Sequence, residues 1–164
     1  MQEAISLISQ KINGENVDWS EMKFKQTGRV DDEYRFQAYF INEIINNEQF
    51  KNILGVKELY FIGSEVILHE GVRQTRRKPD VVAHDGRGKI FLFELKRNGS
   101  KDKAIEQVND YIEYYGESEN YKELLLNYPM TEVKEIKEYN GWAVEGNEGK
   151  RNIEKVKDKY IKIS

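Results

Sequence analysis

The segment Lys89–Lys96, with the sequence KIFLFELK, constrains the fold more than any other part of the chain. Successive side chains of a β-strand point to opposite faces of the sheet. One face of this strand carries Phe91, Phe93 and Leu95, and the other carries Ile90, Leu92, Glu94 and Lys96. Both faces are apolar over most of their length, which is typical of a central strand covered on both sides. The sequence therefore predicts an α/β (α+β) fold in which a central mixed sheet is flanked by helices.

Apolar alternation bounded by turn residues predicts further strands. The expected strands are Glu58–Ile62, Glu65–His69, Lys78–His84, Lys89–Lys96, Tyr139–Val144 and Tyr160–Ile163. Tight hairpins are expected at Gly63-Ser64 and at Asp85–Gly88, because glycine-containing turns of this kind join antiparallel neighbours.

Helical spacing of apolar residues is strongest after Asp31. The residues that recur at spacings of three and four are Phe36, Tyr39, Phe40, Ile44 and Ile45. Asp31 or Asp32 is the expected N-cap, and Phe50–Leu54 should extend this helix or pack against it. Other helices are expected at residues 1–12, 101–115 and 121–128. We divide the chain into residues 1–30, a helix and connection packing on the core, and residues 31–164, the domain that carries the candidate site.

The composition is that of one globular domain, with 38% hydrophobic and 34% charged residues in a chain of 164. The chain has no cysteine, which excludes disulfide scaffolds, zinc–thiolate sites and cysteine nucleophiles. No apolar run reaches the ~18 residues of a membrane span, and the N-terminus lacks a signal-peptide pattern. A cytoplasmic protein without a membrane partner is expected.

Two carboxylates and a lysine should meet at one end of the sheet. Asp80 follows Pro79 at the start of its strand, and pairing across the Asp85–Gly88 turn brings it near Glu94 and Lys96. Such a group is costly to hold together unless an ion or a ligand binds within it. Carboxylate oxygens suit magnesium. The alternative is that Asp80 is a turn residue and that Glu94 and Lys96 form a surface ion pair.

This arrangement fits phosphodiester hydrolysis. Asp80, Glu94 and the backbone carbonyl of Leu95 could hold one or two Mg²⁺ ions, which Mn²⁺ should replace. The metal would polarise the phosphate and activate water, while Lys96 would orient that water or stabilise charge on the phosphate oxygens.

The order of these motifs resembles the PD-(D/E)XK nuclease superfamily. Pro79-Asp80 is followed after thirteen residues by Glu94-Leu95-Lys96. Phe93–Arg97, together with Gln107 and Tyr111 four residues apart on the next helix, is similar to the RecB-type nucleases and to the catalytic domain of NucS-type endonucleases. The resemblance implies a restriction-endonuclease-like αβββαβ core. It also implies that Gln107 and Tyr111 position the catalytic groups or the DNA.

The resembling families also carry a glutamate on the helix before the sheet. Glu33 is the candidate for that catalytic and metal-binding role, since it shares the stripe of Phe36 and Phe40. The alternative is that Glu33 only complements the helix dipole, and Glu43 is a weaker rival on the same helix. His69 and His84 are interpreted as structural or solvated, because His84 lies four residues, or ~13 Å, beyond Asp80 along its strand.

Basic residues surround the candidate site although the net charge is −3. The predicted nucleic-acid-binding residues are Arg73, Arg76, Arg77, Lys78, Arg97 and Lys101. Arginine matches phosphate geometry, so these residues are expected to contact DNA; the alternative is a solvated basic loop.

The sequence therefore predicts a Mg²⁺-dependent deoxyribonuclease acting in repair, recombination or phage and defence DNA processing. By resemblance it would leave a 5′-phosphate and a 3′-hydroxyl. The small size favours a homodimer or a partner subunit. Two alternatives stay open: a catalytically silent nucleic-acid-binding or assembly module with the same fold, and a domain that only forms protein interactions.

Overall fold

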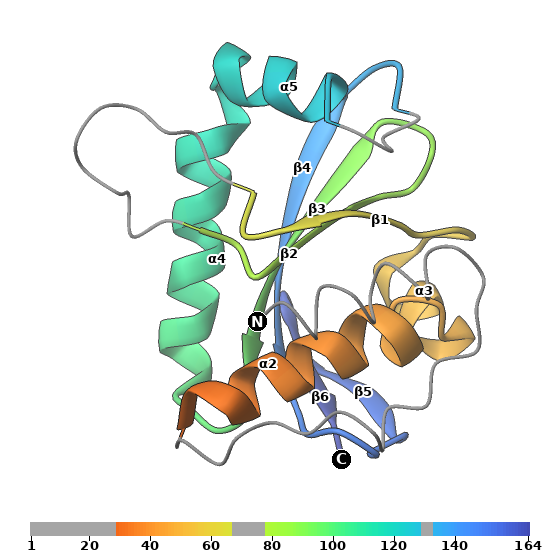
Figure 1. Ribbon diagram of the computed structural model, residues 1–164, viewed down its shortest axis with the longest axis vertical. Coiled ribbons are helices and arrows are strands. Elements are labelled where there is room, and N and C mark those ends of the chain that lie inside the picture. Colours follow the sequence, from red (N-terminus) through yellow and green to blue (C-terminus); the bar gives the residue numbers. More distant parts are fainter. Residues whose placement is uncertain (1–28, 67–77, 129–132) are drawn as a thin grey trace.

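A mixed sheet forms the centre of the protein (Figure 1). The computed structural model describes residues 29–66, 78–128 and 133–164, with side chains from Tyr34 onward. Within these residues the sheet has six strands in the order β1-β2-β3-β4-β6-β5. The strands are β1 (Tyr60–Ser64), β2 (Val81–His84), β3 (Lys89–Lys96), β4 (Glu138–Glu145), β5 (Ile153–Lys157) and β6 (Tyr160–Ile163).

The first three strands are antiparallel neighbours, and β4 then runs parallel to β3. β6 pairs parallel to β4, and β5 pairs antiparallel to β6 at the sheet edge. β3 therefore lies inside the sheet with β2 and β4 on its two sides, which confirms the prediction of a central strand.

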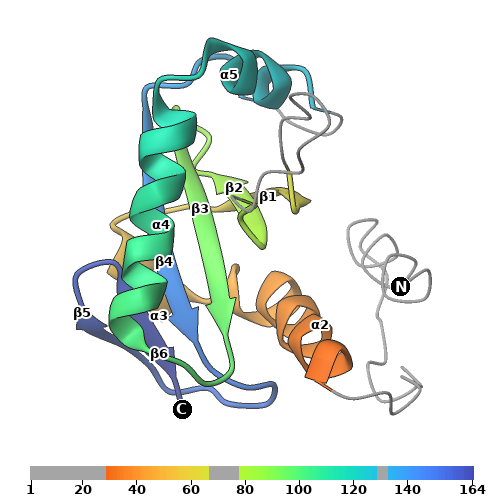
Figure 2. The same ribbon diagram turned by 90° about the vertical axis from the view of Figure 1, so that its left-hand side faces the viewer.

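Helices cover both faces of the sheet (Figure 2). The helices are α2 (Arg29–Tyr39), the π-helix η2 (Phe40–Ile44), α3 (Glu48–Leu54), α4 (Lys101–Gly116) and α5 (Glu119–Leu126). α2, η2 and α3 pack on the face of β3 that carries Phe91 and Phe93, while α4 and α5 pack on the face of Ile90 and Leu92. This confirms the alternation read from the sequence and a mixed α+β architecture with a sheet flanked by helices.

Local sequence signals define the segments around β3. In the β2–β3 turn, the Asp85 carboxylate accepts hydrogen bonds from the main-chain N–H groups of Arg87 (2.7 Å) and Lys89 (3.0 Å). Gly86 and Gly88 take positive φ angles of 75° and 103°, which glycine adopts without steric cost. The Ser100 side chain caps α4. The predicted hairpin and the predicted helix are both confirmed here.

The hairpin expected at Gly63-Ser64 is wrong. Both residues lie inside β1, where Gly63 pairs with Val82 and Ser64 with Val81. The register shifts between Phe61 and Gly63, so this glycine marks a bulge and not a turn. A Cβ at Gly63 would lie 2.7 Å from the Val66 side chain, which shows that close packing requires the glycine.

Other boundaries also differ from expectation. α2 begins at Arg29, so Asp31 and Asp32 lie in its first turn and neither is the N-cap. α3 is a separate helix that Asn47 caps, and it packs on the preceding one through a ring contact between Phe50 and Phe40. β5 was not predicted, because only its first residue is buried. The predicted helix at residues 1–12 and most of the strand Glu65–His69 fall outside the described residues, as does the packing of residues 1–28. In the described part of the chain, no helix has the length and apolarity needed to cross a membrane.

Candidate metal and catalytic site

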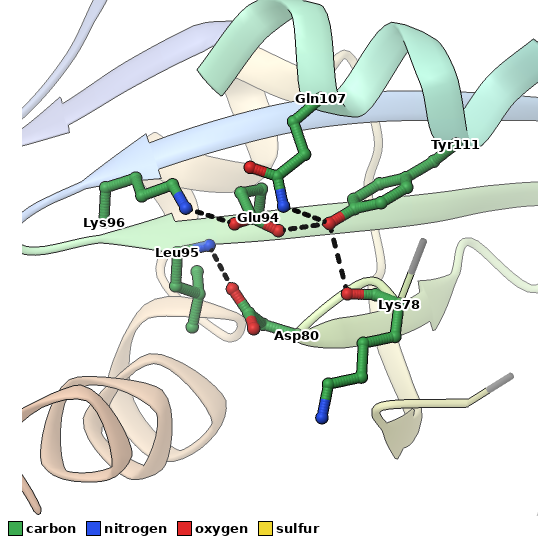
Figure 3. Close-up of polar contacts among 7 residues, drawn as sticks. All are labelled: Lys78, Asp80, Glu94, Leu95, Lys96, Gln107 and Tyr111. Atoms are coloured by element: carbon green, nitrogen blue, oxygen red, sulfur yellow. Dashed lines mark hydrogen bonds and ion pairs between the residues drawn. The ribbon is translucent and has the colours of Figure 1, made fainter. Parts of the chain in front are cut away.

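Asp80 and the end of β3 meet at one end of the sheet (Figure 3). β2 begins at Val81, opposite Phe93, and the Asp80 N–H donates to the Phe93 carbonyl at 2.9 Å. The Leu95 N–H in turn donates to Asp80 Oδ2 at 2.6 Å. The predicted juxtaposition of Asp80 with the Glu94–Lys96 segment is therefore present, and main-chain hydrogen bonds define it.

Glu94 holds its carboxylate under α4, where it is only 4% exposed. One oxygen, Oε1, forms an ion pair with the Lys96 ammonium. The other, Oε2, accepts a hydrogen bond from the Tyr111 hydroxyl. The Lys96 side chain is 33% exposed and that of Glu94 is 5% exposed, so the two do not form an ordinary surface ion pair. A buried carboxylate needs such partners, because an unpaired charge is very costly away from water.

Gln107 and Tyr111 both project from α4 toward Glu94, as the sequence predicted. Gln107 Nε2 donates to the Tyr111 hydroxyl at 2.8 Å, and that hydroxyl also lies 3.1 Å from the Lys78 carbonyl oxygen. Burial, followed by the negative charge of Glu94, raises the pKa of Tyr111 well above its usual range. The hydroxyl therefore keeps its proton and acts as a donor toward Glu94 or Lys78.

The pKa of Asp80 is also strongly perturbed. Burial, and then repulsion by Glu94, raises the pKa of Asp80 from 3.8 to about 8, although the Leu95 N–H and the Lys96 ammonium act in the opposite direction. If Asp80 and Glu94 were both ionised, the site would hold more negative charge than Lys96 alone balances. A proton or a cation is needed to neutralise this charge.

Asp80 and Glu94 supply the kind of oxygen ligands that could hold a magnesium ion. Among the described residues no group of three or more His, Asp or Glu side chains gathers in metal-binding geometry. Magnesium, however, keeps several waters and binds to one or two carboxylates, which Asp80 and Glu94 supply. The N–H and C=O of one strand residue point to the same side. Since the Leu95 N–H points to Asp80, the Leu95 carbonyl is expected to face the same side, where it could serve as a third oxygen donor.

Two contacts to Asp80 were missed by sequence reasoning. Gln37 of α2 donates through Nε2 to the Asp80 carbonyl at 2.7 Å. Glu65 donates its N–H to the same oxygen at 3.2 Å, and its carboxylate pairs with Lys78 at 2.9 Å. Gln37 lies one helical turn after Glu33, so its place on the expected stripe could have suggested it. Glu65 has an unusual φ of 52° that no sequence pattern indicated.

The remaining predicted residues divide into three groups. Glu33 lies in α2, but its side chain is outside the described part, as are Arg73, Arg76, Arg77 and His69. Lys78 and Arg97 are partnered by other side chains: Lys78 by Glu65, and Arg97 Nε by Asn147 at 2.9 Å. Lys101 is the first residue of α4 and is half-buried.

Glu43, the weaker rival of Glu33, and His84 both make contacts with neighbouring residues of the fold. Glu43 is exposed on η2 and bonds to its neighbour Asn42. His84 is 3% exposed, stacks on Tyr60 at a centroid distance of 5.2 Å, and accepts the Gly86 N–H through Nδ1 at 3.1 Å. These contacts agree with the structural interpretation of His84.

The chain was compared with protein-family models, with curated proteins and with solved structures, and nothing in any of the three matches it.

Proposed function

We propose that the protein is a Mg²⁺-dependent deoxyribonuclease of the PD-(D/E)XK type. The observation that carries the proposal is the buried Glu94 carboxylate, held between Lys96 and Tyr111, with Asp80 close enough to repel it. A fold without a charged ligand has no need to collect two carboxylates and an ammonium at a sheet end.

The order of elements also supports the proposal. A helical segment (α2 to α3) precedes three antiparallel strands, and α4 then connects β3 to the parallel strand β4. This is the order expected for the restriction-endonuclease-like αβββαβ core, with Asp80 directly before β2 and Glu94 on the adjacent strand β3.

Each residue would have a separate role. Asp80, Glu94 and the Leu95 carbonyl would hold the metal, which supplies Lewis acidity toward the phosphate and the attacking water. Lys96 would stabilise negative charge on the phosphate oxygens. Tyr111 and Gln107 would keep Glu94 oriented through the hydrogen bonds already present. Glu33, one turn before Gln37, would add a further carboxylate.

The test uses end-labelled single-stranded, duplex and branched DNA with Mg²⁺, Mn²⁺ or chelator. We expect metal-dependent cutting that falls by a factor on the order of 10² or more in Lys96→Ala, a typical loss when one electrostatic group of a catalytic site is removed. The matched control is Lys103→Ala, because Lys103 is an exposed lysine of α4. Cutting by Lys96→Ala at the parental rate would contradict the mechanism. DNA retention in a gel shift without cutting in any metal would favour the catalytically silent binding module.

A further inference from the structure

Gln37 connects helix α2 to the main chain of a predicted metal ligand. Its Nε2 donates to the Asp80 carbonyl at 2.7 Å, between residues 43 positions apart. The same oxygen accepts the Glu65 N–H at 3.2 Å. Because the Gln37 amide is neutral, it holds Asp80 without adding charge next to Glu94.

The helix that carries Gln37 is firmly anchored. Phe36 is 1% exposed, Ala38 is 3% exposed, and Phe40 directly after the helix is fully buried. Phe36 and Phe40 belong to the core cluster that packs on Phe91 and Phe93 of β3. The side chain of Gln37 therefore extends from a fixed base, and its hydrogen bond links the Asp80 main chain to that base.

Glu94 repels Asp80 whenever Asp80 is ionised, as a metal ligand must be, so the position of Asp80 then depends on the groups that hold it. From β3, the Phe93 carbonyl and the Leu95 N–H hold Asp80, and Gln37 holds it from α2. We infer that Gln37 is a positioning residue, which keeps the Asp80 carboxylate at the separation from Glu94 that binds a divalent cation. This inference rests on the metal site of the proposed function, and Gln37 itself need not touch the metal.

The chain contains a matched control for this contact. Gln49 of α3 donates through Nε2 to the Ile153 carbonyl of β5. It is the same bond type, from a glutamine on a helix to a strand carbonyl, and it lies on the same side of the sheet. Asp80 and Glu94 are not among its partners. Gln49→Ala thus removes a comparable structural contact from a different place.

The experiment measures Mn²⁺ binding by calorimetry and by electron paramagnetic resonance on the full chain, below the unfolding temperature of every variant. Gln37→Ala should weaken Mn²⁺ affinity about tenfold, as loss of a group that orients a metal ligand typically does. Gln37→Glu should weaken it at least as much, because an ionised carboxylate cannot donate to the carbonyl. Gln49→Ala should bind Mn²⁺ as the parent does, even though its unfolding temperature falls.

Three results would contradict the inference, and they distinguish its failure from failure of the metal site. Equal Mn²⁺ affinity in Gln37→Ala and the parent protein would overturn the positioning role and leave the proposed function standing. An equal loss of affinity in Gln49→Ala would also overturn it, because general destabilisation would then explain the effect. Failure of the parent protein to bind Mn²⁺ would overturn both the inference and the metal site.

Discussion

Replacing Asp80 by asparagine should stabilise the protein in the absence of metal. In the parent protein the Asp80 carboxylate accepts a hydrogen bond from the Leu95 N–H at 2.6 Å. The asparagine amide keeps an oxygen that can accept the same hydrogen bond. The change removes the carboxyl group that Glu94 repels. Sites that bind a charged ligand commonly store unfavourable energy of this kind, so variants that lose function there often gain stability.

The magnitude follows from the pKa of Asp80, which burial and Glu94 raise from 3.8 to about 8. A tenfold change in acid dissociation corresponds to about 1.4 kcal/mol, so ionised Asp80 opposes folding by at most ~6 kcal/mol. The amide is a weaker acceptor than the carboxylate and leaves Lys96 with less opposing charge. We therefore expect a gain of about half this limit, ~3 kcal/mol, or about 6–12 °C in Tm for a domain of this size.

The pH dependence has a definite sign. Between pH ~4 and ~8, the folded protein holds a proton on Asp80 that the unfolded chain releases. Unfolding therefore releases a proton, and the stability contributed by protonated Asp80 is lost as the pH rises through this window. The advantage of Asp80→Asn over the parent protein should consequently be small near pH 4 and largest at pH 8 and above.

The assay is thermal and urea unfolding at several pH values in chelator, repeated with Mg²⁺. Metal should restore stability to the parent protein, because a ligand that binds only the folded state at 100 times its Kd contributes about 2.7 kcal/mol. Asp80→Asn should respond little to Mg²⁺. The exposed substitution Glu113→Gln is the control and should change stability by less than about 0.5 kcal/mol. If Asp80→Asn is no more stable than the parent at pH 8 in chelator, or if the difference does not depend on pH, the electrostatic reasoning is refuted.

Two further substitutions test the packing around the site. Tyr111→Phe removes the donor to the buried Glu94 carboxylate and should lower the free energy of unfolding by about 2 kcal/mol; an unchanged urea midpoint would contradict this. Gly141→Ala should destabilise the contact between β4 and α4 by about 2 kcal/mol, because its Cβ would lie 2.8 Å from the Val108 carbonyl oxygen. Gly99→Ala is the matched control, since a Cβ there meets nothing within 4 Å, and an equal loss in both variants would count against the steric argument.

The parts of the fold that the sequence predicted are those with strong local signals. β3 is apolar on both faces and lies inside the sheet. The turn that joins it to β2 contains residues suited to positive φ. β5 was missed because an exposed edge strand has almost no apolar alternation, with only Ile153 buried. Gly63 was misassigned because a glycine in a bulge and a glycine in a turn look alike in sequence.

The candidate site likewise combines side chains that the sequence predicted with contacts that it did not predict. Strand alternation and a short hairpin were enough to bring together Asp80, Glu94 and Lys96, and helical spacing placed Gln107 beside Tyr111. Local periodicity contains this information because it determines the direction of each side chain on its own element.

Only the tertiary structure decided which main-chain groups support that site. The bond from Gln37 to Asp80 depends on how α2 packs across the sheet, and the bond from Glu65 depends on the bulged register of β1 against β2. Both join segments whose relative position is determined by burial of the whole core. A single amide donor leaves no periodic pattern in the sequence, so its partner becomes known only when the elements are packed.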